Sequence, residues 1–142
     1  MAPLKTTAFE KALDAFKRSI NVSKIYLADI NASSDLKETL QAGVIQHFEF
    51  CYELSWKMLK RQIEIEAATL ESIDSFSYPV LIREGAERGL VADAKKWLFY
   101  RHQRNNTSHT YHQDKAISVY ETALEFHTDA CALLATLKAR NT

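Results

Sequence analysis

Glycine and proline are scarce in this chain, with three glycines and two prolines among 142 residues. The turns of a β-rich domain draw heavily on these two residue types, so a sheet protein of this length would need many more of them. The scarcity therefore favours long helices joined by short connections. The length leaves room for one hydrophobic core, and we expect a single helical domain over residues 1–142.

Apolar residues recur at steps of three and four along most of the chain, the spacing that places them on one face of a helix. We expect principal helices over residues 7–30, 35–68, 93–105 and 114–139, and a short helix over 78–89. Asp35, Asp93 and Asp114 are the expected N-caps, and Gly89 is the expected end of the short helix. The predicted fold class is all-α: an antiparallel four-helix up-and-down bundle with an additional short helix.

The second segment has an unusually wide apolar face. Its aromatic and aliphatic side chains are closely spaced and exceed what one small core readily covers; they are Phe48, Phe50, Tyr52, Leu54 and Trp56. We therefore expect this helix to be central in the bundle and to contribute to a homodimer.

Composition excludes several functional classes. The formal net charge is zero, so no overall field attracts nucleic acid or membrane. No apolar run approaches the length of a membrane span, and we expect a cytoplasmic protein with no membrane contact. There is no Gly-rich phosphate loop and no Cys-x-x-Cys pair. Cys51 and Cys131 are expected to be buried free thiols.

Histidines give no clear metal site. His109 and His112 have helical i, i+3 spacing, but no third ligand is evident, so we predict that the chain binds no metal. His127 falls on the apolar face of the last segment and is expected to be a core histidine with a satisfied hydrogen bond.

One stretch departs from the balanced background. Residues 94–113 contain no Asp or Glu, while lysine, arginine and histidine accumulate there. Such a stretch makes a local surface that attracts anions, and Trp97, Tyr100 and Tyr111 add rings on which unpaired bases stack. The alternative is a solvated basic face with no ligand.

Within this stretch, Arg104, His109 and Tyr111 follow the pattern Arg-x4-His-x-Tyr. Attack of a ribose 2′-hydroxyl on its neighbouring phosphate needs a group that exchanges protons near neutral pH, which histidine supplies. The charge that develops on the phosphate is matched by the planar fork of arginine. The cluster therefore predicts RNA cleavage without a metal.

Two blocks of sequence resemble a known family. The Arg104–Tyr111 pattern is similar to the signature of the HEPN superfamily, and the HepT-like group, also called nucleotidyltransferase substrate-binding proteins, is the nearest match. Residues 46–57, QHFEFCYELSWK, resemble the helix-two signature of that group, and residues 82–91 with Trp97 agree. The resemblance covers nearly the whole chain from Phe9.

The resemblance implies a homodimeric, metal-independent endoribonuclease that is the toxin of a toxin–antitoxin pair. The antitoxin would be a cognate minimal nucleotidyltransferase that attaches AMP to the motif tyrosine and silences the nuclease. Carried onto this chain, Arg104 binds phosphate, His109 carries protons and Tyr111 accepts AMP. Asn105, Glu49 and Glu53 would support the site. The chain itself would need no cofactor, because ATP and Mg²⁺ act only through the transferase.

Two other functions remain open. One is a non-catalytic subunit that presents substrate to a separate nucleotidyltransferase, and the other is a structural dimer whose basic stretch only docks that partner. The presence of Arg104 and His109 in the signature spacing favours the nuclease, because a docking module needs neither.

Overall fold

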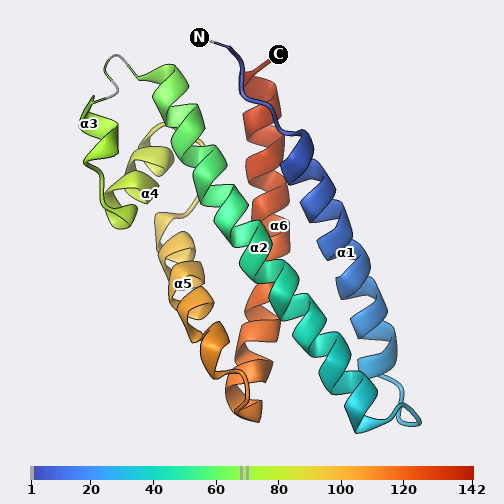
Figure 1. The fold of residues 1–142 in the computed structure, drawn as a ribbon. Helices are drawn as coiled ribbons and strands as arrows, with labels where there is room; N and C mark the ends of the chain where they lie inside the picture. The colour runs from blue at the N-terminus through green and yellow to red at the C-terminus, as the bar shows by residue number, and fades with distance from the viewer. Residues whose placement is uncertain (1, 68, 70) are drawn as a thin grey trace.

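Two long helices form an antiparallel pair along one side of the bundle (Figure 1). The computed structural model describes residues 2–67, 69 and 71–142. α1 (Thr7–Leu27) buries a stripe with steps of four, three and four, made by Phe9, Leu13, Phe16 and Ile20. α2 (Ser34–Glu66) packs against this stripe along most of its length.

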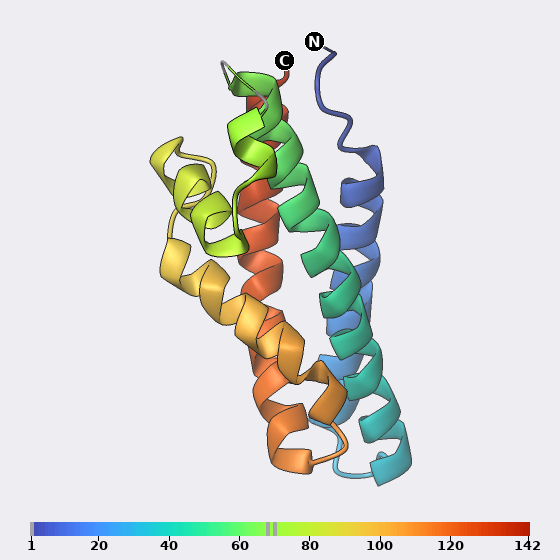
Figure 2. The same cartoon turned by 60° about the vertical axis from the view of Figure 1, so that its left-hand side comes forward.

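The last helix, α6 (Gln113–Arg140), returns beside α1 and α2 and completes the three-helix centre of the fold. α5 (Ala94–Asn105) is the fourth principal helix and packs on both α2 and α6. Figure 2 shows α5 descending at an angle across this pair. Consecutive principal helices alternate in direction, so the all-α bundle predicted from the sequence is confirmed.

Two short helices lie above α5, beside the upper end of α2 (Figures 1 and 2). α3 (Glu71–Asp74) was not expected from the sequence, whereas α4 (Tyr78–Glu87) corresponds to the predicted short helix. Gly89 ends α4 with a φ of +76°, and the Leu90 N–H donates to the Gly85 carbonyl at 2.8 Å. A left-handed glycine after a helix is the usual way to satisfy its last carbonyls.

The core is aromatic at its centre. Phe126 of α6 is fully buried, and rings from α1, α2 and α5 surround it with centroid separations of 5.2–6.4 Å. These rings belong to Phe16, Phe48, Tyr52, Trp97 and Tyr100. This cluster joins the four principal helices and fixes how α5 lies against α2.

Helix ends differ from the prediction at several points. The hydroxyl of Ser33, not the carboxylate of Asp35, caps α2 by accepting from the Leu36 N–H at 3.1 Å. Asp35 and Asp114 instead lie in the first turns of α2 and α6, where a negative carboxylate still interacts favourably with the positive end of the helix dipole. Asp93 caps α5 as predicted. The predicted end of the second helix at residue 68 lies outside the described residues, and α2 ends at Glu66.

Several apolar side chains that follow the helical spacing lie outside the core. α1 ends at Leu27, so Ile30 lies beyond it and is exposed. Ile117 and Cys131 are exposed on α6, because its buried positions are Ala116, Val119 and Ala130 instead. Cys51 is buried as expected. The buried stripe of α6 therefore runs beside the stripe that contains Ile117 and Cys131.

The wide apolar face of α2 is largely covered by the chain itself. Phe48 and Tyr52 are buried, Leu54 and Trp56 are partly buried against the core, and only Phe50 is exposed. No described helix is long and apolar enough to cross a membrane.

Candidate functional site

Arg104 lies in the last turn of α5, where that helix faces α2. Its Nη1 is 3.6 Å from Glu49 Oε2, and its Nε is 3.6 Å from Glu53 Oε1. The two glutamates are one turn apart on α2, so both carboxylates lie on one side of that helix. The structure therefore joins the Arg-x4-His-x-Tyr motif to the block at residues 46–57 through three of the predicted site residues: Arg104, Glu49 and Glu53.

The guanidinium of Arg104 keeps capacity for an anion. Both ion-pair distances exceed hydrogen-bond length, and Nε is buried without a hydrogen-bond partner. Nη1 donates to the Thr107 hydroxyl at 3.2 Å, which orients the fork from the following turn. The side chain of Arg104 is 32% exposed, so solvent and ligands reach it.

His109 and Tyr111 lie beyond the end of α5. A 3₁₀ helix, η1 (Asn106–His109), follows α5 directly, and the threonine hydroxyls there bond to backbone carbonyls. This competition for backbone groups explains why the helix stops within the predicted stretch. Both the His109 and the Tyr111 side chains are exposed, with 6.4 Å between their ring centroids.

The motif is therefore divided in one copy of the chain. Arg104 is held by Glu49 and Glu53, while the rings of His109, Tyr111 and His112 form a separate exposed group. Among the hydrogen bonds and ion pairs of the described residues, none joins Arg104 to His109. Asn105 is exposed at the end of α5 and lines the same cavity as Glu53, and no hydrogen bond among the described residues joins its side chain to either glutamate.

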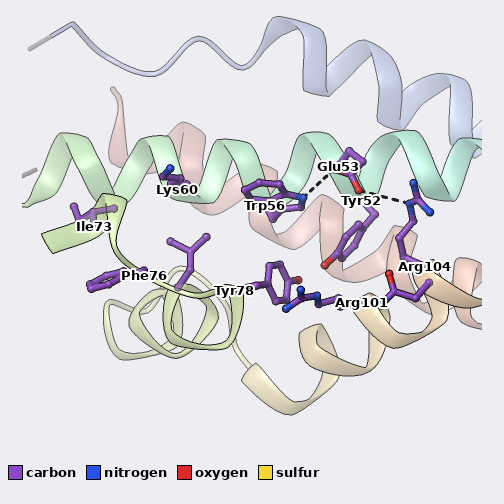
Figure 3. A pocket seen from close by; sticks show the side chains of 11 residues that line it. Tyr52, Glu53, Trp56, Lys60, Ile73, Phe76, Tyr78, Arg101 and Arg104 are labelled. Carbon is purple, nitrogen blue, oxygen red and sulfur yellow. Dashed lines mark hydrogen bonds and ion pairs between the residues drawn. The ribbon is translucent and has the colours of Figure 1, made fainter. Parts of the chain in front are cut away.

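A cavity of about 450 Å³ opens beside Arg104, between α2 and the segment from α3 to α5 (Figure 3). Three rings form much of its wall: Tyr52 and Trp56 of α2, and Tyr78 at the start of α4. Trp56 Nε1 donates to Glu53 Oε2 at 3.2 Å, which ties the wall to the carboxylate beside Arg104. Arg101 lies over the Tyr78 ring, 4.6 Å from its centroid.

Burial keeps the tyrosine hydroxyls of this cavity protonated. It raises the pKa of Tyr78 to about 12, and it raises the pKa of Tyr52 as well, because a phenolate would lose its hydration there. At neutral pH both side chains are therefore neutral.

Two of the three rings predicted to stack on unpaired bases are not accessible. Trp97 and Tyr100 are buried in the core around Phe126, so neither ring can stack on a base. Tyr111 remains available, being 77% exposed. The accessible rings next to Arg104 are Trp56 and Tyr78, whose spacing looked like ordinary core and helix-start positions.

Other residues of the chain partly compensate the basic stretch. Lys96 pairs with Asp129 of α6 at 3.3 Å, and Arg104 pairs with the two glutamates of α2. The stretch is consequently less positive in three dimensions than in sequence.

The described residues include no group of three or more His, Cys, Asp or Glu side chains arranged to hold a metal ion. Metal independence stays a prediction. His127 is partly buried, its Nε2 lies 3.1 Å from the Leu13 carbonyl, and burial lowers its pKa. It is a packing histidine, as predicted.

Comparison with known proteins identifies a family and similar structures. Residues 4–139 match the family described as nucleotidyltransferase substrate binding protein like. The chain is 41% identical over 133 residues to a Haemophilus influenzae protein named probable ribonuclease HepT, with 91% of each chain covered.

Two solved structures share the fold. One, from Haemophilus influenzae, is described as revealing the fold of a substrate-binding domain of a nucleotidyltransferase; it has a TM-score of 0.78 and 39% identity over 90% of this chain and 98% of that one. The other, from Thermus thermophilus, has a TM-score of 0.63 and 22% identity over 86% of this chain and 98% of that one.

Proposed function

The chain belongs to the family of nucleotidyltransferase substrate-binding-like proteins, and on that premise we propose that it is a metal-independent endoribonuclease. The observation that carries the proposal is the placement of Arg104, whose guanidinium has a buried Nε without a hydrogen-bond partner beside an open cavity. The same arginine begins the motif that ends in the exposed His109 and Tyr111. The name of the Haemophilus influenzae relative supports the same activity.

In the proposed reaction, the Arg104 guanidinium binds two oxygens of the scissile phosphate. His109 accepts the proton of the adjacent ribose 2′-hydroxyl as the 2′-oxygen attacks phosphorus. The bond from phosphorus to the 5′-oxygen breaks, that oxygen takes a proton from solvent, and protonated His109 returns its proton to solvent. The products are a 2′,3′-cyclic phosphate and a 5′-hydroxyl, so all atoms are accounted for without a metal.

Glu49 and Glu53 would position Arg104 in this scheme. Two carboxylates at 3.6 Å favour one orientation of the fork, yet they also compete with phosphate for it. A phosphate would compete with these carboxylates by making hydrogen bonds to the fork that the present ion pairs do not make.

We propose that the working site is formed by a homodimer. In the described part of the chain, no hydrogen bond or ion pair joins Arg104 to His109 within one copy, and a cleft between two copies would let the motifs of both chains act on one strand. Phe50, exposed on α2, is the apolar side chain that such an interface would cover.

Control by a partner is the remaining part of the proposal. A cytoplasmic minimal nucleotidyltransferase, the antitoxin of the pair, would use ATP and Mg²⁺ to attach AMP to Tyr111, whose side chain is 77% exposed. The added phosphate would place negative charge two residues from His109 and repel RNA.

A second function is also supported by a specific observation. The family description and the description of the Haemophilus influenzae structure both refer to substrate binding for a nucleotidyltransferase. A non-catalytic subunit of that kind would bind its ligand at the same cavity but would leave RNA intact.

Cleavage of RNA by the purified protein in EDTA tests these alternatives. Arg104→Ala and His109→Ala should each reduce the rate by about a hundredfold or more, because each removes one catalytic group. Arg83→Ala and His102→Ala are matched controls, since both residues are exposed and lie outside the motif. Intact RNA with the wild-type protein would favour the substrate-binding subunit, and loss of cleavage in EDTA would refute the metal-free mechanism.

A further inference from the structure

The cavity beside Arg104 has two chemically different ends. Figure 3 shows Arg104 at one end, with Arg101 next to it over Tyr78, and Ile73 and Phe76 at the other end, where Lys60 also lies and pairs with Asp74 at 3.7 Å. The rings of Tyr52, Trp56 and Tyr78 lie between these ends. A volume of about 450 Å³ falls within the range of small-molecule sites. The cavity therefore suits a flat, largely apolar group that is joined to an anion.

The aromatic rings are available to such a group. The Trp56 and Tyr78 rings meet at 84° with centroids 6.2 Å apart, and Tyr52 and Tyr78 meet at 44°. An edge-to-face contact such as that of Trp56 with Tyr78 covers at most one face of one ring. Arg101 lies over the Tyr78 ring at 4.6 Å and Lys57 over the Trp56 ring at 5.9 Å, so a bound base would share these rings with the two cations. Trp56 is only partly buried, and its indole N–H is already satisfied by Glu53, which holds the ring in place.

The two arginines lie one turn apart on α5, and both line the cavity. Arg101 is stacked over Tyr78, and Arg104 is the proposed phosphate ligand. In a nucleotide, one ribose separates the base from its phosphate. A phosphate at Arg104 would thus bring its own base to the mouth of the aromatic cavity.

We propose that this cavity binds one unpaired nucleobase of the RNA strand, next to the phosphate held at Arg104. The assignment rests on the proposed ribonuclease function and adds a base-binding subsite to it. It makes Trp56 and Tyr78 binding residues that hold the strand by stacking on one base. It also predicts that the chain acts on single strands, in which a base is free to leave its neighbours.

Binding without cleavage tests the subsite. Fluorescence anisotropy would compare a short labelled single-stranded RNA of mixed sequence with an abasic ribose–phosphate oligomer of equal length, both on the His109→Ala protein. We expect RNA to bind about tenfold or more tighter than the abasic oligomer, because base stacking on an aromatic side chain contributes about that much. Trp56→Ala should remove most of the difference, with Tyr78 retaining a part, while Trp56→Phe should keep most of it.

Trp56 also reports occupancy directly. Unlabelled RNA should quench its fluorescence in a saturable manner, whereas buried Trp97 gives a constant background. The quenching should disappear in Trp56→Phe, even though binding persists. Phe99→Ala is the matched control, since Phe99 is an exposed ring of α5 outside the cavity. Circular dichroism and Tm would confirm that each variant is folded.

Several results would overturn the subsite. Equal affinity for RNA and the abasic oligomer, or a difference that Trp56→Ala leaves unchanged in a folded protein, would leave the cavity without a base. Quenching by free ATP that RNA cannot displace would make it a free-nucleotide site instead. Because binding is read on a protein that cannot cleave, failure of the wild-type chain to cut RNA would refute the nuclease and not the subsite.

Discussion

Phe126→Ala should destabilise the protein more than most single substitutions. Five aromatic side chains surround Phe126 with ring centroids 5.2–6.4 Å away, and the side chain is fully buried. Truncation of a buried phenylalanine costs about 3–5 kcal/mol, since large rings cannot collapse into the space that is left. Typical domains have about 5–15 kcal/mol of stability in total, so the variant would lose a large part of it.

Thermal unfolding measures this loss. Unfolding entropy is about 2.1 cal/mol/K per residue, so for 142 residues a loss of about 4 kcal/mol lowers Tm by about 13 °C. Urea titration should give the same free energy with an unchanged m-value. Phe99→Ala is the control, because that ring is 47% exposed and should cost less than about 1 kcal/mol.

The cavity should respond as well, because the Tyr52 ring packs on Phe126 with centroids 6.1 Å apart. We expect Phe126→Leu to retain most of the stability and the RNA affinity, since it refills much of the space. If Phe126→Ala lowered Tm no more than Phe99→Ala does, the aromatic cluster would not be the packing centre that joins the four helices.

Three further outcomes are expected. With an active partner transferase, ATP and Mg²⁺, mass spectrometry should show AMP on the peptide that contains Tyr111, and Tyr111→Phe should lose it. An unmodified wild-type chain under the same conditions would refute regulation by AMP addition. Sedimentation should give a dimer that Phe50→Lys weakens, whereas a wild-type monomer at high concentration would contradict the composite site. Burial lowers the pKa of His127 in the folded chain, so the unfolded chain binds a proton on this imidazole more tightly. The contribution of His127 to folding stability is therefore complete above the unfolded pKa of about 6.5. It is lost as the pH falls through the lower folded pKa. Urea titrations from pH 7 to about 5 should show a shallower fall for His127→Gln, and an unchanged slope would exclude His127 as the source.

The sequence by itself determined the helical class and most helix positions. Scarce glycine and proline, apolar steps of three and four, Asp93 as a cap and Gly89 as a terminator are local signals that act within a few residues of one another. The same holds for the spacing of Arg104, His109 and Tyr111, which identified the motif without any contact between its parts.

Only the tertiary structure decided which rings reach a ligand and what Arg104 touches. Trp97 and Tyr100 have the residue types of stacking platforms, but the packing of α5 on α6 turns them onto Phe126. Trp56 and Tyr78 lie 22 positions apart in the chain, and the approach of α4 to α2 places their rings at one cavity. Residue type and periodicity give the amphipathic face of each helix, whereas the rotation and partners of each helix depend on how all the side chains of the core pack at once.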